Sequence, residues 1–213
     1  MKTSYCSSAL IALLSVVGCT SLQTGGEVQY GRQALLAGRS DLALGYFYSA
    51  AQLDPSYVYT TGSSPRQSVW SYVGRTEYLT GRLPQARQTL ERALADNREE
   101  DIARLYLGLT LAKAGDRQGG LKEIESGMRG INNFLNYINE AQRYSIGQYW
   151  DPDRDIRGAI QVNLAMIEGK DLNWERLTAD TEWLGIRMEE ESDLARRQEA
   201  QDRERDSGRD GQP

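Results

Sequence analysis

The sequence contains no histidine, and this absence limits the chemistry that the protein can perform. It excludes Ser-His-Asp and Cys-His catalysis, and it removes the imidazole ligands that most zinc sites use. A lysine base or a pair of carboxylates remains available for catalysis. We therefore expect a protein that is not an enzyme and that has no cofactor and no metal site.

Cysteine is almost as scarce, because Cys6 and Cys19 are the only two and none follows Cys19. They lie on either side of an apolar run, ALIALLSVV (9–17), which follows the positive charge of Lys2. Nine residues at about 1.5 Å each cannot cross a hydrocarbon core of roughly 30 Å. The charged start, the short apolar run and the small residue at its end are typical of a secretory signal peptide, which we expect to be residues 1–18.

The four residues VVGC (16–19) resemble the lipobox of bacterial lipoproteins. In that family a diacylglycerol is attached to the cysteine thiol, the signal is cut before the cysteine, and the new amino group is acylated. The resemblance implies that Cys19 carries the lipid, palmitate included, and becomes the mature N-terminus. Several acyl chains together hold a protein firmly on a membrane. The alternative is an ordinary signal peptide whose cleavage site contains a cysteine.

The residues after Cys19 bear on the location of the protein. Thr20 stands where an aspartate would retain enterobacterial lipoproteins in the inner membrane, so the resemblance favours the outer membrane, with the protein facing the periplasm. Residues 19–26 are expected to be the lipidated cysteine and a short flexible tether.

The charge balance argues against nucleic acid as a partner. The chain has 25 Lys and Arg against 30 Asp and Glu, a formal net charge of −5, and loss of residues 1–18 removes Lys2 and no acid, which gives −6. Nucleic-acid binding needs a basic face.

A repeated pattern of glycine and apolar residues organises the centre of the chain, whose content of Ala, Leu, Glu, Arg and Gln favours helix. The segments that share it are GRQALLAGRSDLALGYFYSAAQLDP (31–55), GRTEYLTGRLPQARQTLERALADN (74–97) and GLTLAKAGDRQGGLKEIESGMRG (108–130). Each begins with a glycine and has a second glycine seven residues later. From that second glycine, a small residue follows at +5, a large apolar residue at +9 and a small residue at +12.

This pattern resembles the tetratricopeptide repeat (TPR), a unit of two antiparallel helices. Trp70 occupies the aromatic position of the family, and Pro55 occupies the proline position at the end of a unit. The units fall at 24–57, 67–100 and 101–134. The resemblance implies an all-α solenoid of about three helical hairpins over residues 27–134, interrupted by a loop insertion at 58–66. The alternative is a generic array of helical hairpins with coincidental glycines.

The third unit departs from the pattern, because its second helix contains Gly119, Gly120 and Gly127. Each glycine in a helix costs about 1 kcal/mol relative to alanine. We expect this helix to be short or mobile.

Residues 135–195 are expected to form C-terminal capping helices, because the last unit of a solenoid leaves an apolar face open. Three apolar stripes at helical spacing support this: Ile131, Phe134, Leu135 and Ile138; Ile156, Ile160, Leu164 and Ile167; and Trp174, Leu177, Thr181, Leu184 and Met188. Residues 196–213 are charged on all sides and predict a solvated helix that runs into disorder.

Two acidic clusters could suggest a metal or catalytic site. Asp151, Asp153 and Asp155 alternate as in a calcium loop, but glycine at position six and glutamate at position twelve of such a loop are missing, which favours a proline turn and a helix N-cap. Glu189 to Glu191 is expected to be a solvated helix face.

In the TPR family the first helix of each unit lines a concave groove that binds peptides or partner segments. The resemblance places eight residues in that groove: Arg32, Leu35, Leu36, Arg75, Tyr78, Leu79, Leu109 and Lys113. Arginines and aromatic residues are common interface anchors, and paired arginines can hold a carboxylate. The alternative is that these charges only keep the solenoid soluble.

These observations predict a non-enzymatic, membrane-anchored TPR lipoprotein, which serves as a protein–protein interaction scaffold for a cell-envelope machine. Lipoproteins of this build take part in pilus assembly or secretion, exopolysaccharide export, and peptidoglycan remodelling, and the sequence does not choose among these processes. The rival is an envelope enzyme that uses carboxylates, such as a glycan hydrolase. It would need two inward-facing acids roughly 5–9 Å apart.

Overall fold

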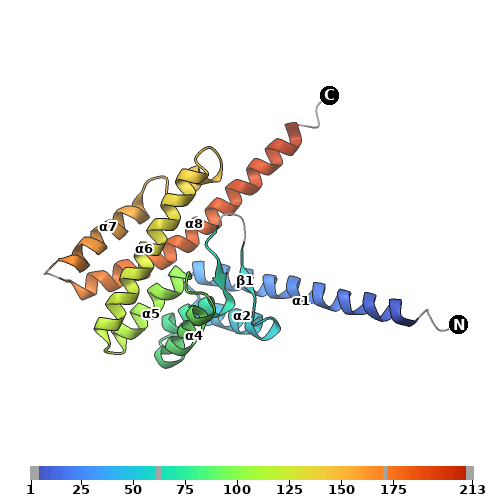
Figure 1. Ribbon diagram of the computed structural model, residues 1–213, viewed down its shortest axis with the longest axis horizontal. Helices are drawn as coiled ribbons and strands as arrows, with labels where there is room; N and C mark the ends of the chain where they lie inside the picture. The colour runs from blue at the N-terminus through green and yellow to red at the C-terminus, as the bar shows by residue number, and fades with distance from the viewer. Residues whose placement is uncertain (1–4, 61–63, 170–171, 210–213) are drawn as a thin grey trace.

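The protein is all-α in the computed structural model, which describes residues 5–60, 64–169 and 172–209, with side chains from Ser21 to Arg205 (Figure 1). The helices are α1 (Tyr5–Leu36), α2 (Ser40–Leu53), α3 (Val69–Leu79), α4 (Leu83–Asp96), α5 (Asp101–Lys113), α6 (Arg117–Ala141), α7 (Asp155–Glu168) and α8 (Trp174–Arg209). A short 3₁₀ helix, η1 (Ile146–Tyr149), follows α6.

Helices α1 to α6 pack as three consecutive antiparallel pairs, α1 with α2, α3 with α4, and α5 with α6. In each pair the chain reverses at a glycine with positive φ: Gly38 (70°), Gly81 (78°) and Gly115 (102°). Glycine adopts this left-handed conformation without a steric penalty and commonly ends helices for that reason. The second glycine of each repeated segment therefore ends the first helix of its pair.

The first glycine of each repeated segment lies directly against the large apolar residue of the second helix. The contacting pairs are Gly31 with Phe47, Gly74 with Leu90, and Gly108 with Ile124. A Cβ atom built on these glycines would lie 2.5 to 2.7 Å from the side chain opposite, which is closer than real Cβ contacts. The same close approach thus occurs three times at equivalent positions.

Helix α6 contradicts the expectation of a short or mobile helix, because it runs for 25 residues. A Cβ on Gly120 would lie 2.6 Å from the carbonyl oxygen of Gly108, and one on Gly127 would lie 2.9 Å from that of Asp101. The glycines therefore let the backbones of α5 and α6 touch, and this packing offsets their low helix propensity. Helix α6 also contains Ile131 to Ile138, so that apolar stripe belongs to the third pair and not to a separate cap.

The connection between the first two pairs is more ordered than the loop expected at 58–66. Strand β1 (Val58–Tyr59) pairs antiparallel with β2 (Gln67–Ser68), and residues 61–63 lie outside the described chain. The indole Nε1 of Trp70 donates a hydrogen bond of 2.7 Å to the carbonyl oxygen of Pro55. The two positions that carried the resemblance at this junction therefore contact each other.

The N-terminal helix includes the segment that was expected to be a flexible tether. Helix α1 is continuous from Tyr5, so the tether at residues 21–26 is helical instead of flexible. Residues 1–4 and the side chain of Cys19 lie outside the described part of the structure, and lipidation stays a prediction. Within the described chain, none of the helices combines the length and the apolar character needed to cross a membrane.

Helix α8 is the longest of the described helices, and it has the predicted apolar face, because Leu177, Thr181, Leu184 and Met188 are all buried. It packs against α1, α5 and α7. Its C-terminal end and the N-terminal end of α1 both extend from the helical body as single helices (Figure 1). Helix α8 continues to Arg209 through most of the charged tail expected at 196–213, of which 210–213 lie outside the described residues.

Candidate functional site

The first helices of the three pairs, α1, α3 and α5, together form one face of the molecule, and α8 lies against that face. Each of these helices contacts α8 through at least one side chain: Arg32 from α1, Arg75 from α3 and Tyr106 from α5. The repeat pattern predicts a concave groove on this face, and we call the face the groove below. The groove is therefore occupied by the C-terminal helix of the same chain.

A buried cluster of two arginines and one glutamate joins the groove to α8. The carboxylate of Glu189 accepts a hydrogen bond from Nε of Arg32 on one oxygen and from Nη1 of Arg75, at 3.0 Å, on the other. All three side chains are 1% exposed. Arg32 and Arg75 lie in different pairs, and Glu189 follows them by more than a hundred residues. The contact therefore fixes three distant segments relative to one another.

Aromatic rings complete the surroundings of the two guanidinium groups. Arg32 lies 4.3 Å from the ring centroid of Tyr59 and donates a hydrogen bond of 2.5 Å to its hydroxyl, while Arg75 lies 5.1 Å from the ring centroid of Tyr106. Burial lowers the pKa of Arg32, but the adjacent Glu189 carboxylate outweighs burial, so that the pKa is raised overall. Both arginines are thus cationic, and they share a single anion.

Two further contacts fix the position of α8 in the groove. Nη2 of Arg75 donates a hydrogen bond of 2.9 Å to the carbonyl oxygen of Gly185, and the hydroxyl of Tyr78 donates one of 2.5 Å to Glu182. Burial and the hydrogen bond to Glu182 raise the pKa of Tyr78. A Cβ on Gly185 would lie 2.6 Å from Cε2 of Tyr106, so a larger residue at this position would push α8 out of the groove.

Of the eight predicted groove residues, Arg32, Arg75 and Tyr78 contact α8. Leu35, Leu109 and Tyr78 are buried, and Leu36 and Leu79 are half-buried. Lys113 is exposed, with its Nζ 5.0 Å from the ring centroid of Tyr78.

Arg32 and Arg75 require a correction to the sequence analysis. They neither line an open groove nor act as solvated surface charges, because α8 covers them. Binding of a separate protein by the eight residues stays a prediction.

The expectation that Glu189 to Glu191 form a solvated helix face is wrong for two of the three residues. Glu189 and Glu191 are 1% and 0% exposed, and only Glu190 faces solvent. Glu191 forms an ion pair of 2.5 Å with Arg187, and burial raises the pKa of Glu191. A signal was present in the sequence, because Glu191 lies seven residues after Leu184 and so extends the apolar stripe of α8.

The aspartates at 151–155 form a helix start, as the sequence favoured. The carboxylate of Asp151 accepts a hydrogen bond of 2.9 Å from the backbone N–H of Ile156 and one of 2.8 Å from Nε of Arg157, at the beginning of α7. Asp153 and Asp155 are exposed. Across the described residues, no group of three or more Cys, Asp or Glu side chains is arranged to hold a metal ion.

The groove holds α8, whose Glu189 contacts two arginines and whose Gly185 lies against the ring of Tyr106. The contacts that hold this helix are ion pairs and hydrogen bonds within the chain. A scan of known protein families finds no match to this sequence, and a search of curated proteins finds no significant relative.

Proposed function

We propose that this protein is a lipid-anchored scaffold of the bacterial cell envelope, built from three TPR-like helical hairpins, which acts by holding other proteins together. The observation that carries the proposal is the glycine contact that recurs in all three hairpins, at Gly31, Gly74 and Gly108. Hairpins with this recurring contact stack into extended surfaces, and such surfaces commonly serve protein binding.

The anchor is assigned to Cys19, with the outer membrane as the site of attachment and the hairpins facing the periplasm. Cys19 precedes Arg32 by thirteen residues within the continuous helix α1. At about 1.5 Å per residue, this places the groove about 20 Å from the acylated cysteine along the helix. In this proposal α1 is a stiff spacer that holds the hairpins at a defined distance from the membrane.

Helix α8 determines how the scaffold can meet a partner. While Glu189 is bound to Arg32 and Arg75, these arginines are unavailable to another protein. A partner therefore either replaces α8 in the groove or binds to a surface outside it. The process that the scaffold would serve is pilus assembly or secretion, exopolysaccharide export, or peptidoglycan remodelling.

The anchor is tested by labelling bacteria that express the full-length chain with radioactive palmitate. Wild type and Cys6→Ala should both incorporate the label and sediment with membranes, because Cys6 precedes the expected cleavage site. Cys19→Ala should incorporate none and should leave the membrane fraction. Equal labelling of Cys19→Ala and wild type would disprove the assignment.

A further inference from the structure

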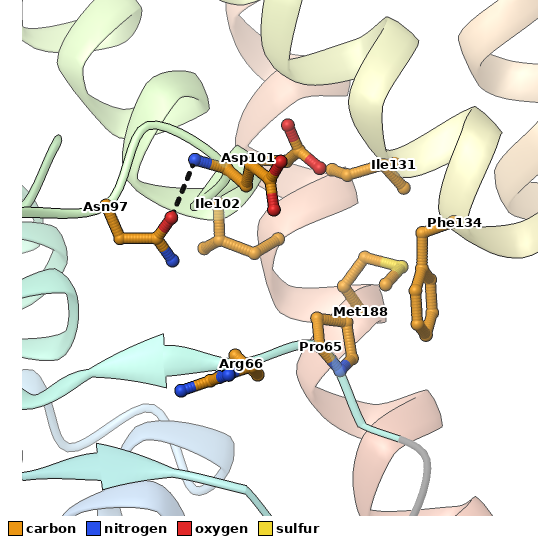
Figure 2. Close-up of a pocket in the computed structure, with 9 residues that line it drawn as sticks. Pro65, Arg66, Asn97, Asp101, Ile102, Ile131, Phe134 and Met188 are labelled. Atoms are coloured by element: carbon orange, nitrogen blue, oxygen red, sulfur yellow. Dashed lines mark hydrogen bonds between the residues drawn. The ribbon is translucent and has the colours of Figure 1, made fainter.

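A cavity of about 170 Å³ lies beside α8, outside the groove, between α5, α6 and the segment that precedes β2 (Figure 2). One side of it is apolar and includes Ile131, Phe134 and Met188, whereas Arg66, Glu99 and Asp101 contribute polar groups. This volume is close to that of an engineered cavity that binds benzene, so it suits one side chain or one small molecule. Met188 adjoins Glu189, so the cavity is complete only while α8 lies in the groove.

Asp101 contributes a carboxylate whose charge is poorly compensated. No described residue donates a hydrogen bond to this carboxylate, and burial raises the pKa of Asp101 to about 6. The nearby Arg104 offsets only part of this effect, because its guanidinium is bound to Glu123 at 2.9 Å. A cation placed in the cavity would supply the missing partner.

A second hollow, which Trp70 helps to line, adjoins the cavity. The two hollows share Arg66, Asn97 and Glu99, so they lie next to each other, and we treat them together as one surface. The ionisable residues that line them are four acids, Asp96, Glu99, Glu100 and Asp101, and one base, Arg66. This surplus of negative charge favours cationic ligands and disfavours anionic ones.

We propose that this surface binds an extended basic segment of a partner protein and that the cavity receives one lysine side chain of that segment. The methylene groups of the lysine pack against Ile131, Phe134 and Met188, and its ammonium group pairs with the carboxylate of Asp101. Lysine combines an apolar stem with a compact charge, which matches a cavity that is apolar on one side and acidic on the other. The nature of the partner rests on the proposed scaffold function, whereas the amine site does not depend on it.

The first test asks whether the cavity binds an amine. The full-length chain in detergent micelles, labelled with ¹³C at its methionine methyl groups, is titrated with n-butylammonium chloride as a mimic of the lysine side chain. The chain has four methionines, and Met188→Leu assigns the reporting signal. We expect a saturable shift of the Met188 methyl signal with n-butylammonium, and at most one tenth of that affinity for n-butanol or butanoate.

Matched variants then identify the recognising charge. Asp101→Asn should weaken n-butylammonium binding at least tenfold, whereas Asp153→Asn, at an exposed aspartate, should leave it unchanged. Arg66→Gln should preserve or tighten binding, because it removes the one positive charge of the surface. Thermal unfolding of each variant establishes that it is folded.

Three results would overturn the amine site. Equal affinity for n-butanol and n-butylammonium would show an apolar cavity with no role for charge. Binding of butanoate that Arg66→Gln abolishes would show an anion site. The absence of any saturable shift at Met188 would show that the cavity binds none of these groups.

The second test addresses the partner. A short alanine-containing peptide with two lysines, the second of them near its end, should displace n-butylammonium. The same peptide with norleucine in place of lysine should not. If n-butylammonium binds and the lysine peptide fails to displace it, the site accepts small amines only and the basic-segment proposal is wrong. That failure leaves the lipid anchor untouched, because palmitate labelling of Cys19 measures the anchor separately.

Discussion

Replacement of Glu189 by glutamine is the perturbation that probes the groove most sharply. The substitution preserves the shape of the side chain and removes the only carboxylate that is bound to Arg32 and Arg75 among the residues that the structure describes. Both guanidinium groups are 1% exposed, so neither can regain full hydration without movement of α8. Loss of one partner from a buried ion pair typically costs about 3–5 kcal/mol. Here two cations lose the same partner, which places the expected loss at the upper end of that range.

The assay is urea-induced unfolding of the full-length chain in detergent micelles, followed by circular dichroism. A typical domain is stable by about 5–15 kcal/mol, so Glu189→Gln should shift the midpoint strongly toward lower urea. The matched control is Glu190→Gln on the next residue, which is exposed and pairs with Arg187 at the surface. Its effect should stay within about 0.5 kcal/mol. A difference of less than about 1 kcal/mol between the two variants would refute the reasoning.

A triple replacement separates the burial of charge from the loss of contact. If unpaired charge is the cause, Arg32→Met and Arg75→Met combined with Glu189→Leu should recover most of the stability that Glu189→Gln loses, since apolar side chains of similar volume often replace a buried ionic cluster without loss. A triple variant less stable than Glu189→Gln would show that the hydrogen bonds themselves dominate.

The remaining predictions concern two glycines and one acid. Gly120→Ala should lower the stability measured by thermal unfolding by about 1–3 kcal/mol, because its Cβ would lie 2.6 Å from a backbone oxygen of α5. Gly45 has open space around it, so Gly45→Ala should stabilise the protein by about 0.5–1 kcal/mol. Equal effects of the two substitutions would contradict the close packing of α5 and α6. The pKa of Asp101 is raised from 3.8 to about 6, so the folded state binds this proton more tightly than the unfolded state, and stability should fall as pH rises through this window. Asp101→Asn should abolish that fall and, after allowance for partial solvent screening, gain on the order of 1 kcal/mol at pH 7; curves of stability against pH that run parallel for the two proteins would contradict this.

The hairpins could be predicted from the sequence because their determinants are local. The turn glycines need positive φ, and the first glycine of each segment needs a large partner sixteen residues later, as with Gly31 and Phe47. These requirements recur at fixed spacing, so three segments reinforced one prediction. The length of α6 was mispredicted because helix propensity alone ignores the close backbone contact that Gly120 permits.

The position of α8 was not predicted, because it depends on contacts between residues far apart in the sequence. The repeat pattern identified Arg32 and Arg75 as facing the same groove, but nothing in it indicates which chain segment fills that groove. Three consecutive glutamates predict a solvated face, and the apolar stripe of α8 predicts a cap for the end of the solenoid. Only the three-dimensional arrangement shows that Glu189 pairs with both arginines.

The central claim is that the protein fills its own groove with α8, and hydrogen–deuterium exchange of the full-length wild type tests it directly. Backbone amides of residues 182–192 should exchange as slowly as those of α5, because their helix is buried against three others. Amides of residues 203–209, at the end of α8 that extends from the body, should exchange quickly. Equally fast exchange in both segments of α8 would contradict the claim and would leave the groove open to partners.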